Sequence, residues 1–237
     1  MDNKKLSKIK CLCFDIDGTL YDLRVMRKTM FKKLILSLFS KNITFKEICI
    51  LNCYRKTLEA FRNGVEITNK SLSQLHTSSV SEKMHCTSEM INQVVGKWMT
   101  DVPCDKIHNY VWPDMKNTLV KLKDKGYHLA VLSDYPAKEK VNAMGLDGIF
   151  EAILSCQDLD SNGYKPNTNG FRKIAKHFDL NPCECIYIGD SYERDIRGAI
   201  ENQMHAILLN PYIETIKEQP HEFMIINKFS DLLRVLP

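Results

Sequence analysis

Three short apolar runs in this sequence end in the same way, and this repetition constrains the fold more than any other feature. They are Ile9–Phe14 before Asp15, Leu129–Leu132 before Ser133-Asp134, and Cys185–Ile188 before Gly189-Asp190. Such short runs that stop at a turn or a carboxylate are typical of buried strands. Strands are apolar throughout when helices cover both faces of a parallel sheet. The pattern therefore predicts a parallel sheet whose strands end in polar groups.

Helical patterns alternate with strand patterns from Tyr110 onward. The expected helices lie near Pro113–Gly126, Pro136–Gly145, Phe171–Phe178 and Ile196–Ile200, and Ala206–Leu209 is a further expected strand. Between Ser133 and Lys165 there is room for one helix and one strand. This alternation predicts an α/β fold with an open, Rossmann-like parallel sheet.

The segment between the first strand and Tyr110 has no strand-like run and reads as helical. Val25–Phe39 is amphipathic, and Thr44 with Glu47 forms a capping-box pattern ahead of a second helix. The polar stretch Thr68–Thr87 is expected to be loop plus a short helix, and Ser88 to cap a last helix. We therefore expect a core made of residues 1–24 plus 110–237 and an all-helical domain over residues 25–109.

Polar groups at the strand ends predict the position and the chemistry of a site, because ligands bind at the carboxyl ends of the strands in open parallel sheets. Carboxylates at positions 15, 17, 190 and 195 would meet there and repel one another unless a cation joined them. Oxygen ligands favour a hard ion, and Mg²⁺ is the usual partner of carboxylates and phosphate. Lys165 supplies a positive charge, so the set predicts a phosphorylated substrate held between a metal and a lysine.

Four motifs in order resemble those of the haloacid dehalogenase-like (HAD) hydrolases. They are Asp15-Ile16-Asp17-Gly18-Thr19-Leu20, then Ser133, then Lys165-Pro166, then Gly189-Asp190 with Asp195. The resemblance covers about residues 8–24 and 110–210, which is essentially the whole expected core. It implies a HAD-like α/β fold and phosphatase activity.

The resemblance also implies a role for each motif residue. Asp15 would be the nucleophile that forms an aspartyl-phosphate, and Asp17 would be the general acid and base. The hydroxyl of Ser133 and the backbone N–H of Asp134 would bind the phosphate, and Lys165 would neutralise its charge. The Mg²⁺ would be held by Asp15, by the backbone carbonyl of Asp17 and by Asp190, with Asp195 supporting the metal site from behind these ligands or through water.

The helical segment lies between the first two motifs, which is the position of a C1 cap in this family. A cap of this type implies a small phosphorylated substrate and closure that excludes water. The hinges are expected near Tyr21–Arg24 and Asn109–Pro113. Candidate specificity residues on the cap are Arg24, Arg27, Lys28, Arg55 and Arg62.

Other activities of the same motif set remain open. A phosphomutase of the β-phosphoglucomutase type uses the same four motifs, and a non-catalytic HAD-like binding module would keep the fold alone. Dehalogenase chemistry is disfavoured because it uses neither Mg²⁺ nor a general acid at the position of Asp17. A phosphonatase would need a cap lysine that forms a Schiff base, and no spacing in the sequence supports one.

Charge and cysteine content limit the kinds of partner and the cellular compartment that we expect for this protein. With 33 Lys and Arg against 29 Asp and Glu, the net charge of +4 is too small to indicate nucleic-acid binding. The nine cysteines form no CxxC pair, and no apolar stretch is long enough to span a membrane. We therefore expect a cytoplasmic protein with no nucleic-acid or membrane partner.

Overall fold

The centre of the molecule is a six-stranded parallel sheet. The computed structural model describes residues 6–64, 71–158, 163–213 and 222–237. The strands are β1 (Cys11–Phe14), β2 (His128–Ser133), β3 (Ala152–Ser155), β4 (Cys185–Gly189), β5 (His205–Leu209) and β6 (Met224–Ile226). Their spatial order is β3-β2-β1-β4-β5-β6, and every neighbouring pair is parallel. The predicted open parallel sheet is confirmed, although the sequence patterns do not predict β6.

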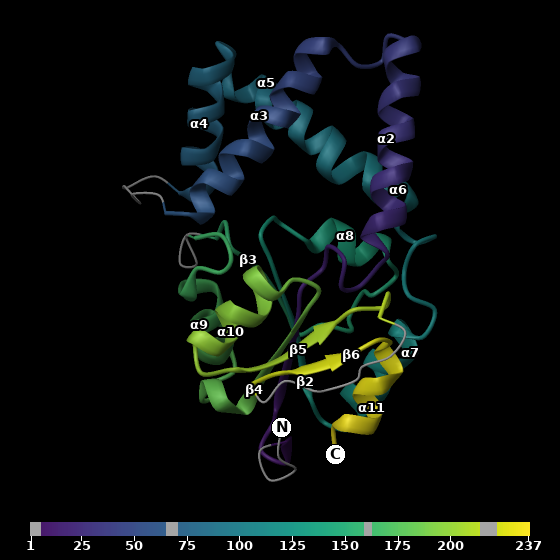
Figure 1. Cartoon of the computed structure of the whole chain (residues 1–237), viewed down its shortest axis with the longest axis vertical. Helices are drawn as coiled ribbons and strands as arrows, with labels where there is room; N and C mark the ends of the chain where they lie inside the picture. The colour runs from purple at the N-terminus through teal and green to yellow at the C-terminus, as the bar shows by residue number, and fades with distance from the viewer. Residues whose placement is uncertain (1–5, 65–70, 159–162, 214–221) are drawn as a thin grey trace.

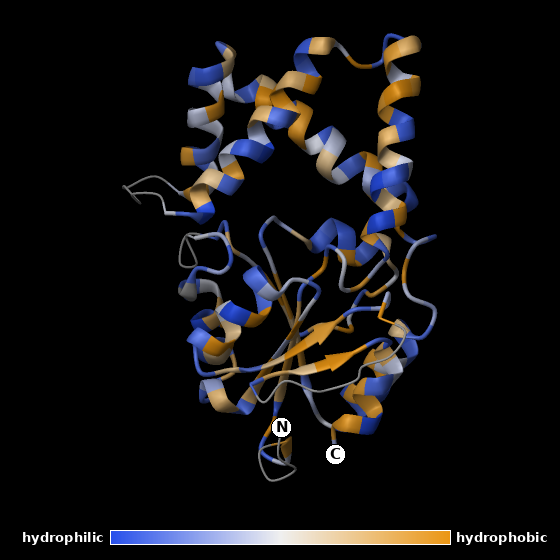
Figure 2. Ribbon diagram, in the orientation of Figure 1, coloured by the Kyte–Doolittle hydropathy of each residue, from blue (hydrophilic) through white to orange (hydrophobic). Residues whose placement is uncertain are grey.

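Helices cover both faces of this sheet. The helices α7 (Met115–Asp124), α8 (Lys138–Ala143) and α11 (Leu232–Val235) contribute to one apolar cluster, and α9 (Thr168–His177) and α10 (Arg197–Glu201) contribute to another. Successive residues of β1 enter the two clusters alternately, with Leu12 and Phe14 in the first and Cys11 and Cys13 in the second. The double burial explains why β1 is apolar at every position. The strands seen broadside in Figure 2, β5 and β6, are also coloured hydrophobic.

A separate helical unit occupies the chain between β1 and α7 and stands at one end of the sheet (Figure 1). It comprises α2 (Leu23–Phe39), α3 (Phe45–Arg62), α4 (Leu72–Met84), α5 (Ser88–Gly96), a π-helical turn (Lys97–Asp101) and α6 (Val102–Ile107). The unit has an apolar cluster of its own, which includes Ile50, Val80, Ile91 and Trp98. None of the helices in the described ranges is both long and apolar enough to cross a membrane.

The helix starts and helix lengths predicted for the helical unit are correct in part. The capping box of Thr44 with Glu47 is confirmed at the start of α3. Thr87, rather than Ser88, caps α5, because its hydroxyl accepts the N–H of Met90. The polar stretch expected to hold a short helix contains the 13-residue α4, which has a capping box of its own. Residues 65–70, where this stretch begins, lie outside the described residues.

The two connections between the sheet and the helical unit lie side by side. Tyr21 and Val111 form an isolated antiparallel bridge, and the N–H of Asp22 donates to the carbonyl of Tyr110 at 2.8 Å. Asp22 also caps α2 through its side chain. The helical unit therefore joins the core through one paired crossing.

Candidate active site

The first, second and fourth strands bring their terminal polar residues together at one edge of the sheet. Asp15 follows β1, Ser133 ends β2, and Asp190 follows β4. Because β1 lies between β2 and β4 in parallel register, these three ends are neighbours. The N–H of Asp15 continues the ladder and donates to the carbonyl of Ile188 at 2.9 Å. The sheet thus fixes the backbone under the predicted nucleophile.

Lys165 is the buried centre of the site. Its Nζ lies 2.6 Å from Asp15 Oδ1 and 2.6 Å from Asp195 Oδ1, and it donates to the Tyr187 hydroxyl at 3.0 Å. The side chain of Lys165 is only 2% exposed. Its two carboxylate partners raise its pKa well above the usual value even though burial opposes the charge. A permanent cation therefore orients one oxygen of Asp15.

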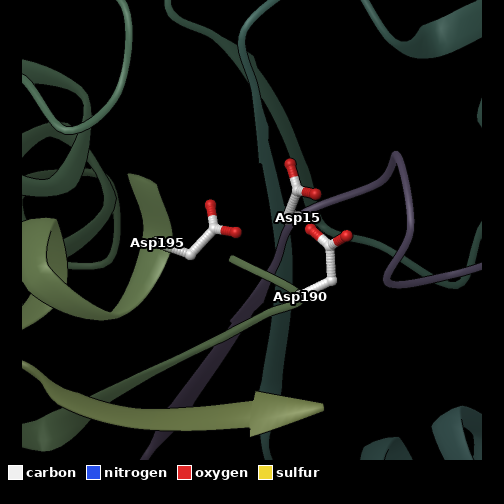
Figure 3. Close-up of side chains that lie close together, drawn as sticks. All are labelled: Asp15, Asp190 and Asp195. Atoms are coloured by element: carbon white, nitrogen blue, oxygen red, sulfur yellow. The ribbon is translucent and has the colours of Figure 1, made fainter. Parts of the chain in front are cut away.

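Three carboxylates converge beside this lysine (Figure 3). Ligand oxygens of Asp15, Asp190 and Asp195 lie within 4.8 Å of one another. Burial, with repulsion from Asp195, raises the pKa of Asp15 to about 7 despite Lys165. Burial and the same neighbour raise the pKa of Asp190 to about 6. Carboxylates that resist ionisation side by side are chemically suited to a divalent cation.

The three carboxylates differ in how strongly their oxygens are already engaged by neighbouring donors. Asp195 uses Oδ1 for Lys165 and Oδ2 for the N–H of Ser191, which donates at 3.1 Å. Asp190 has a contact with Arg194 at 3.3 Å. Asp15 keeps Oδ2 for a long contact with the Thr19 hydroxyl, at 3.4 Å. Asp15 and Asp190 are therefore better placed than Asp195 to bind an ion directly.

Gly18 is required by the close approach of the first motif to Asp190. Its φ is +105°, and a Cβ on this residue would lie 2.1 Å from Asp190 Oδ2. Any other residue would displace the Asp190 carboxylate or strain the turn. The glycine of the first motif thus has a steric reason in the site itself.

The carboxylate of Asp17 is not among the three that converge, and it forms its own ion pair. Lys140, on α8, lies 2.7 Å from Oδ1 and 2.9 Å from Oδ2, and the Tyr21 hydroxyl donates to Oδ1 at 2.5 Å. Burial on its own would raise the pKa of Asp17, but Lys140 and Tyr21 lower it below the ordinary value. Asp17 is a carboxylate in this arrangement, and its side chain is not one of the three that converge.

Ser133 ends β2 and Asp134 follows it, as predicted, but the Asp134 side chain has an additional structural role. The hydroxyl of Ser133 is buried and accepts a long contact, 3.4 Å, from the N–H of Tyr135. One oxygen of Asp134 accepts the N–H of Lys165 at 3.0 Å, and the other pairs with Arg62 of α3. The Asp134 carboxylate therefore joins the second motif to the third and to the helical unit.

The arginines that the sequence offers as specificity candidates lie in different places, and Arg55 is exposed on α3. Arg62 contacts the core at Asp134, whereas Arg24 stacks on Tyr212 at 3.6 Å from the ring centre. A cavity of about 140 Å³ opens beside the site, and Arg24, Arg27, Gly18 and Asp190 are among its lining residues. Lys140, Tyr187 and Tyr21 were not predicted as site residues, because no motif or spacing marks them.

Comparison with known proteins identifies the family. A family model for haloacid dehalogenase-like hydrolases matches residues 12–209. The chain belongs to this family. Solved HAD structures agree in fold: 2-haloacid dehalogenase from Pseudomonas syringae has a TM-score of 0.67 at 22% identity, and the HAD-hydrolase YfnB from Bacillus subtilis, solved with bound magnesium, has 0.66 at 18%. Each comparison covers 96% of this chain and 98% of the other.

Curated relatives of this HAD protein include phosphatases with two different named substrates. Glyceraldehyde 3-phosphate phosphatase of Methanothermobacter thermautotrophicus is 28% identical over 53% of this chain and 58% of its own length. Phosphoglycolate phosphatase of Pasteurella multocida is 35% identical over 38% of this chain and 40% of its own. These matches span about half the length of the relatives or less. Glyceraldehyde 3-phosphate phosphatase of Methanocaldococcus jannaschii aligns over 96% of this chain and 97% of its own, at 22% identity.

Proposed function

We propose that this HAD protein is a Mg²⁺-dependent phosphatase that hydrolyses a small phosphorylated metabolite through an aspartyl-phosphate intermediate. The observation that carries the proposal is the contact of buried Lys165 with Asp15 and Asp195 at the shared carboxyl edge of the strands. Phosphoryl transfer needs an aligned nucleophile and stabilised charge on the phosphoryl oxygens. This arrangement supplies an oriented carboxylate and a fixed cation.

In the proposed reaction an oxygen of Asp15 attacks phosphorus, and the bond from phosphorus to the ester oxygen breaks. Asp17 gives a proton to the leaving oxygen and then takes one from the water that cleaves the acyl-phosphate. Lys140 favours the ionised form of Asp17 in the free protein. Asp17 would therefore become protonated when the dianionic substrate enters the site. Ser133 and the N–H of Asp134 bind phosphoryl oxygens, and Lys165 offsets their charge.

The acidic cluster fits Mg²⁺ by its chemistry, since all its donors are carboxylate oxygens around a small volume. Asp15, Asp190 and the backbone carbonyl of Asp17 would hold the ion, and Asp195 would support it through Ser191 and Lys165. When bound, Mg²⁺ supplies positive charge that stabilises the transferring phosphoryl group.

We further propose that residues 25–109 act as a cap on a core made of residues 1–24 and 110–237. The contact between Arg62 and Asp134 and the bond between His76 Nδ1 and the Tyr164 hydroxyl, at 2.7 Å, both bridge the two parts beside the site. The paired crossing at Tyr21 and Val111 gives the unit a defined point of attachment about which it can close.

Hydrolysis of p-nitrophenyl phosphate by the purified full chain tests the proposed function. We expect turnover with Mg²⁺, loss of turnover in excess EDTA to below about one hundredth, and recovery when Mg²⁺ is restored. The activity has to comigrate with the protein in size-exclusion chromatography. Activity that survives EDTA would contradict the metal requirement, and absence of turnover with every ester offered would overturn the phosphatase assignment.

The acidic cluster also predicts how metal-free stability depends on pH. Asp15 and Asp190 have raised pKa values, about 7 and about 6, so these two carboxyls bind more protons in the folded state than in the unfolded state from about pH 4 up to those values. In EDTA the cluster should therefore lower the thermal midpoint as pH rises from 5 to 7.5, and saturating Mg²⁺ should offset this loss. The difference between the wild type and an Asp15→Asn/Asp190→Asn variant isolates the effect. A difference that is constant over this pH range would contradict the prediction.

A further inference from the structure

Two buried donors lie without partners at the seam between the helical unit and the core. Among the residues that the structure describes, neither Arg62 Nε nor the Tyr135 hydroxyl has a hydrogen-bond partner. Leaving such a group unpaired costs about 1–3 kcal/mol, so a native protein usually has a reason for it. Among the same residues, two further buried side-chain atoms lack a partner: Trp98 Nε1, a donor in the apolar cluster of the helical unit, and Asn202 Oδ1, an acceptor. The seam is therefore a place where a ligand would satisfy existing donors.

Arg62 is held in place beside the phosphate-binding motif. It ends α3, its side chain is 11% exposed, and its two terminal nitrogens contact Glu59 at 2.8 Å and Asp134. The other oxygen of Asp134 accepts the N–H of Lys165. The two terminal nitrogens thus hold the guanidinium in place, and Nε can still donate to another acceptor.

Tyr135 follows Asp134 directly in the chain and lies in the same region, between the helical unit and the core. Its ring centre lies 6.2 Å from that of Tyr54 and 6.1 Å from that of Tyr164, so the cap and the core hold it from both sides. Burial raises the pKa of its hydroxyl well above the usual value, and the charges of Arg62, Asp134 and Asp17 act on it. The hydroxyl therefore stays protonated as a donor and lies within electrostatic range of the predicted general acid.

The chemistry of these two donors selects between kinds of leaving group. A carboxylate has two acceptor oxygens and a full negative charge, and its hydrogen bonds to a guanidinium are about twice as strong as neutral ones. An aldehyde or hydroxyl oxygen can accept from both donors but carries no charge, so its hydrogen bonds to the guanidinium would be weaker than those of a carboxylate. The curated relatives include enzymes named for an acid, phosphoglycolate, and for an aldehyde, glyceraldehyde 3-phosphate.

We propose that Arg62 and Tyr135 determine substrate specificity, and that the substrate is the phosphate ester of a small hydroxy acid whose carboxylate binds Arg62 Nε and the Tyr135 hydroxyl. This inference rests on the proposed phosphatase function and extends it to a substrate class. Asp134 keeps Arg62 in position, and the stacked pair of Tyr54 and His76, with ring centres 3.7 Å apart, supports the wall on the cap side.

A matched pair of substrates tests this proposal. 2-Phosphoglycolate and 2-hydroxyethyl phosphate have the same two-carbon skeleton and differ in having a carboxylate or a neutral hydroxymethyl group. With the full chain and Mg²⁺, we expect kcat/KM to favour the acid by at least about tenfold. Arg62→Gln should lower kcat/KM for the acid about 10- to 100-fold and change that for the neutral ester less than threefold. Tyr135→Phe should shift the ratio in the same direction by a smaller factor.

The ratio of the two substrates within each variant separates specificity from general damage to the site, because a uniform loss leaves it unchanged. Arg55→Gln, an exposed arginine of the same helix, is the matched control and should keep the wild-type ratio. Equal rates on the two esters, or an unchanged ratio in Arg62→Gln, would overturn this inference while hydrolysis of p-nitrophenyl phosphate upholds the phosphatase. Loss of turnover on all three esters in the wild type would overturn the proposed function and this inference with it.

Discussion

Replacing Asp15 with Asn is expected to lower phosphatase kcat by at least about 10³-fold while the protein stays folded. The reason is that the amide cannot act as the nucleophile that receives the phosphoryl group, and removal of a nucleophile costs several orders of magnitude in comparable enzymes. The substitution keeps the shape of the side chain, and Lys165 keeps its contact with Asp195 at 2.6 Å. Initial rates with p-nitrophenyl phosphate and a circular dichroism melt measure the two effects.

Asp124→Asn is the matched control for this variant, because Asp124 is exposed on α7 and takes no part in the site. It should show the wild-type rate. An Asp15→Asn protein that keeps a tenth or more of the wild-type rate would show that Asp15 is not the nucleophile. Incubation of the wild type with a ³²P-labelled ester, followed by acid quench, should trap label on the protein, and Asp15→Asn should trap none.

The backbone of the site could be predicted from the sequence because it depends on local pattern and sheet geometry. The apolar runs before Asp15, Ser133 and Asp190 specify buried parallel strands, and such strands end at a common edge. The observed order places β1 between β2 and β4, as that prediction requires. The short strand β6 was not predicted, since its three residues carry too little periodicity to stand out from a loop.

The side-chain partners of the site could not be predicted, because they join residues far apart in the chain. Lys140 contacts Asp17 across 123 positions, and Arg62 contacts Asp134 across 72. A lysine or arginine on an amphipathic helix has the same sequence signature whether it faces water or a buried carboxylate. Of the five cationic candidates on the helical unit, Arg62 is the one for which the structure shows an ion pair with a motif residue. Only the packing of α3 against the core distinguishes it from Arg55.

The prediction that four carboxylates would gather at the site needs refinement for a similar reason. Asp15, Asp190 and Asp195 converge, whereas the Asp17 side chain pairs with Lys140 and Tyr21. Strand-end geometry predicts where a backbone segment lies, but the direction of a side chain two residues into the turn depends on neighbours from other elements. This separation suits the role proposed for Asp17, because a carboxylate that bound the metal ion would have no proton to give.

Replacing Lys165 with Met is expected to destabilise the fold and to abolish activity. The lysine is the shared partner of Asp15 and Asp195, both within 2.6 Å, and its side chain is 2% exposed. Its removal would leave two buried carboxylates without their cation, and breaking a buried ion pair in this way costs about 3–5 kcal/mol. For a chain of this size the thermal midpoint should fall by roughly 10 °C or more. Differential scanning calorimetry with EDTA present measures this fall without contributions from bound metal.

Lys10 provides a control with the same contact and a different environment. Its Nζ also lies 2.6 Å from a carboxylate, that of Glu184, but the Lys10 side chain is 59% exposed. Lys10→Met should therefore change stability far less than Lys165→Met, because water and salt screen an exposed pair. Adding Asp195→Asn to Lys165→Met should recover part of the lost stability, since one unpaired charge is removed, but none of the activity. If the two lysine variants lost equal stability, burial would not be the source of the Lys165 effect. If the double variant regained turnover, Lys165 would be needed for stability of the fold and not for binding the phosphate.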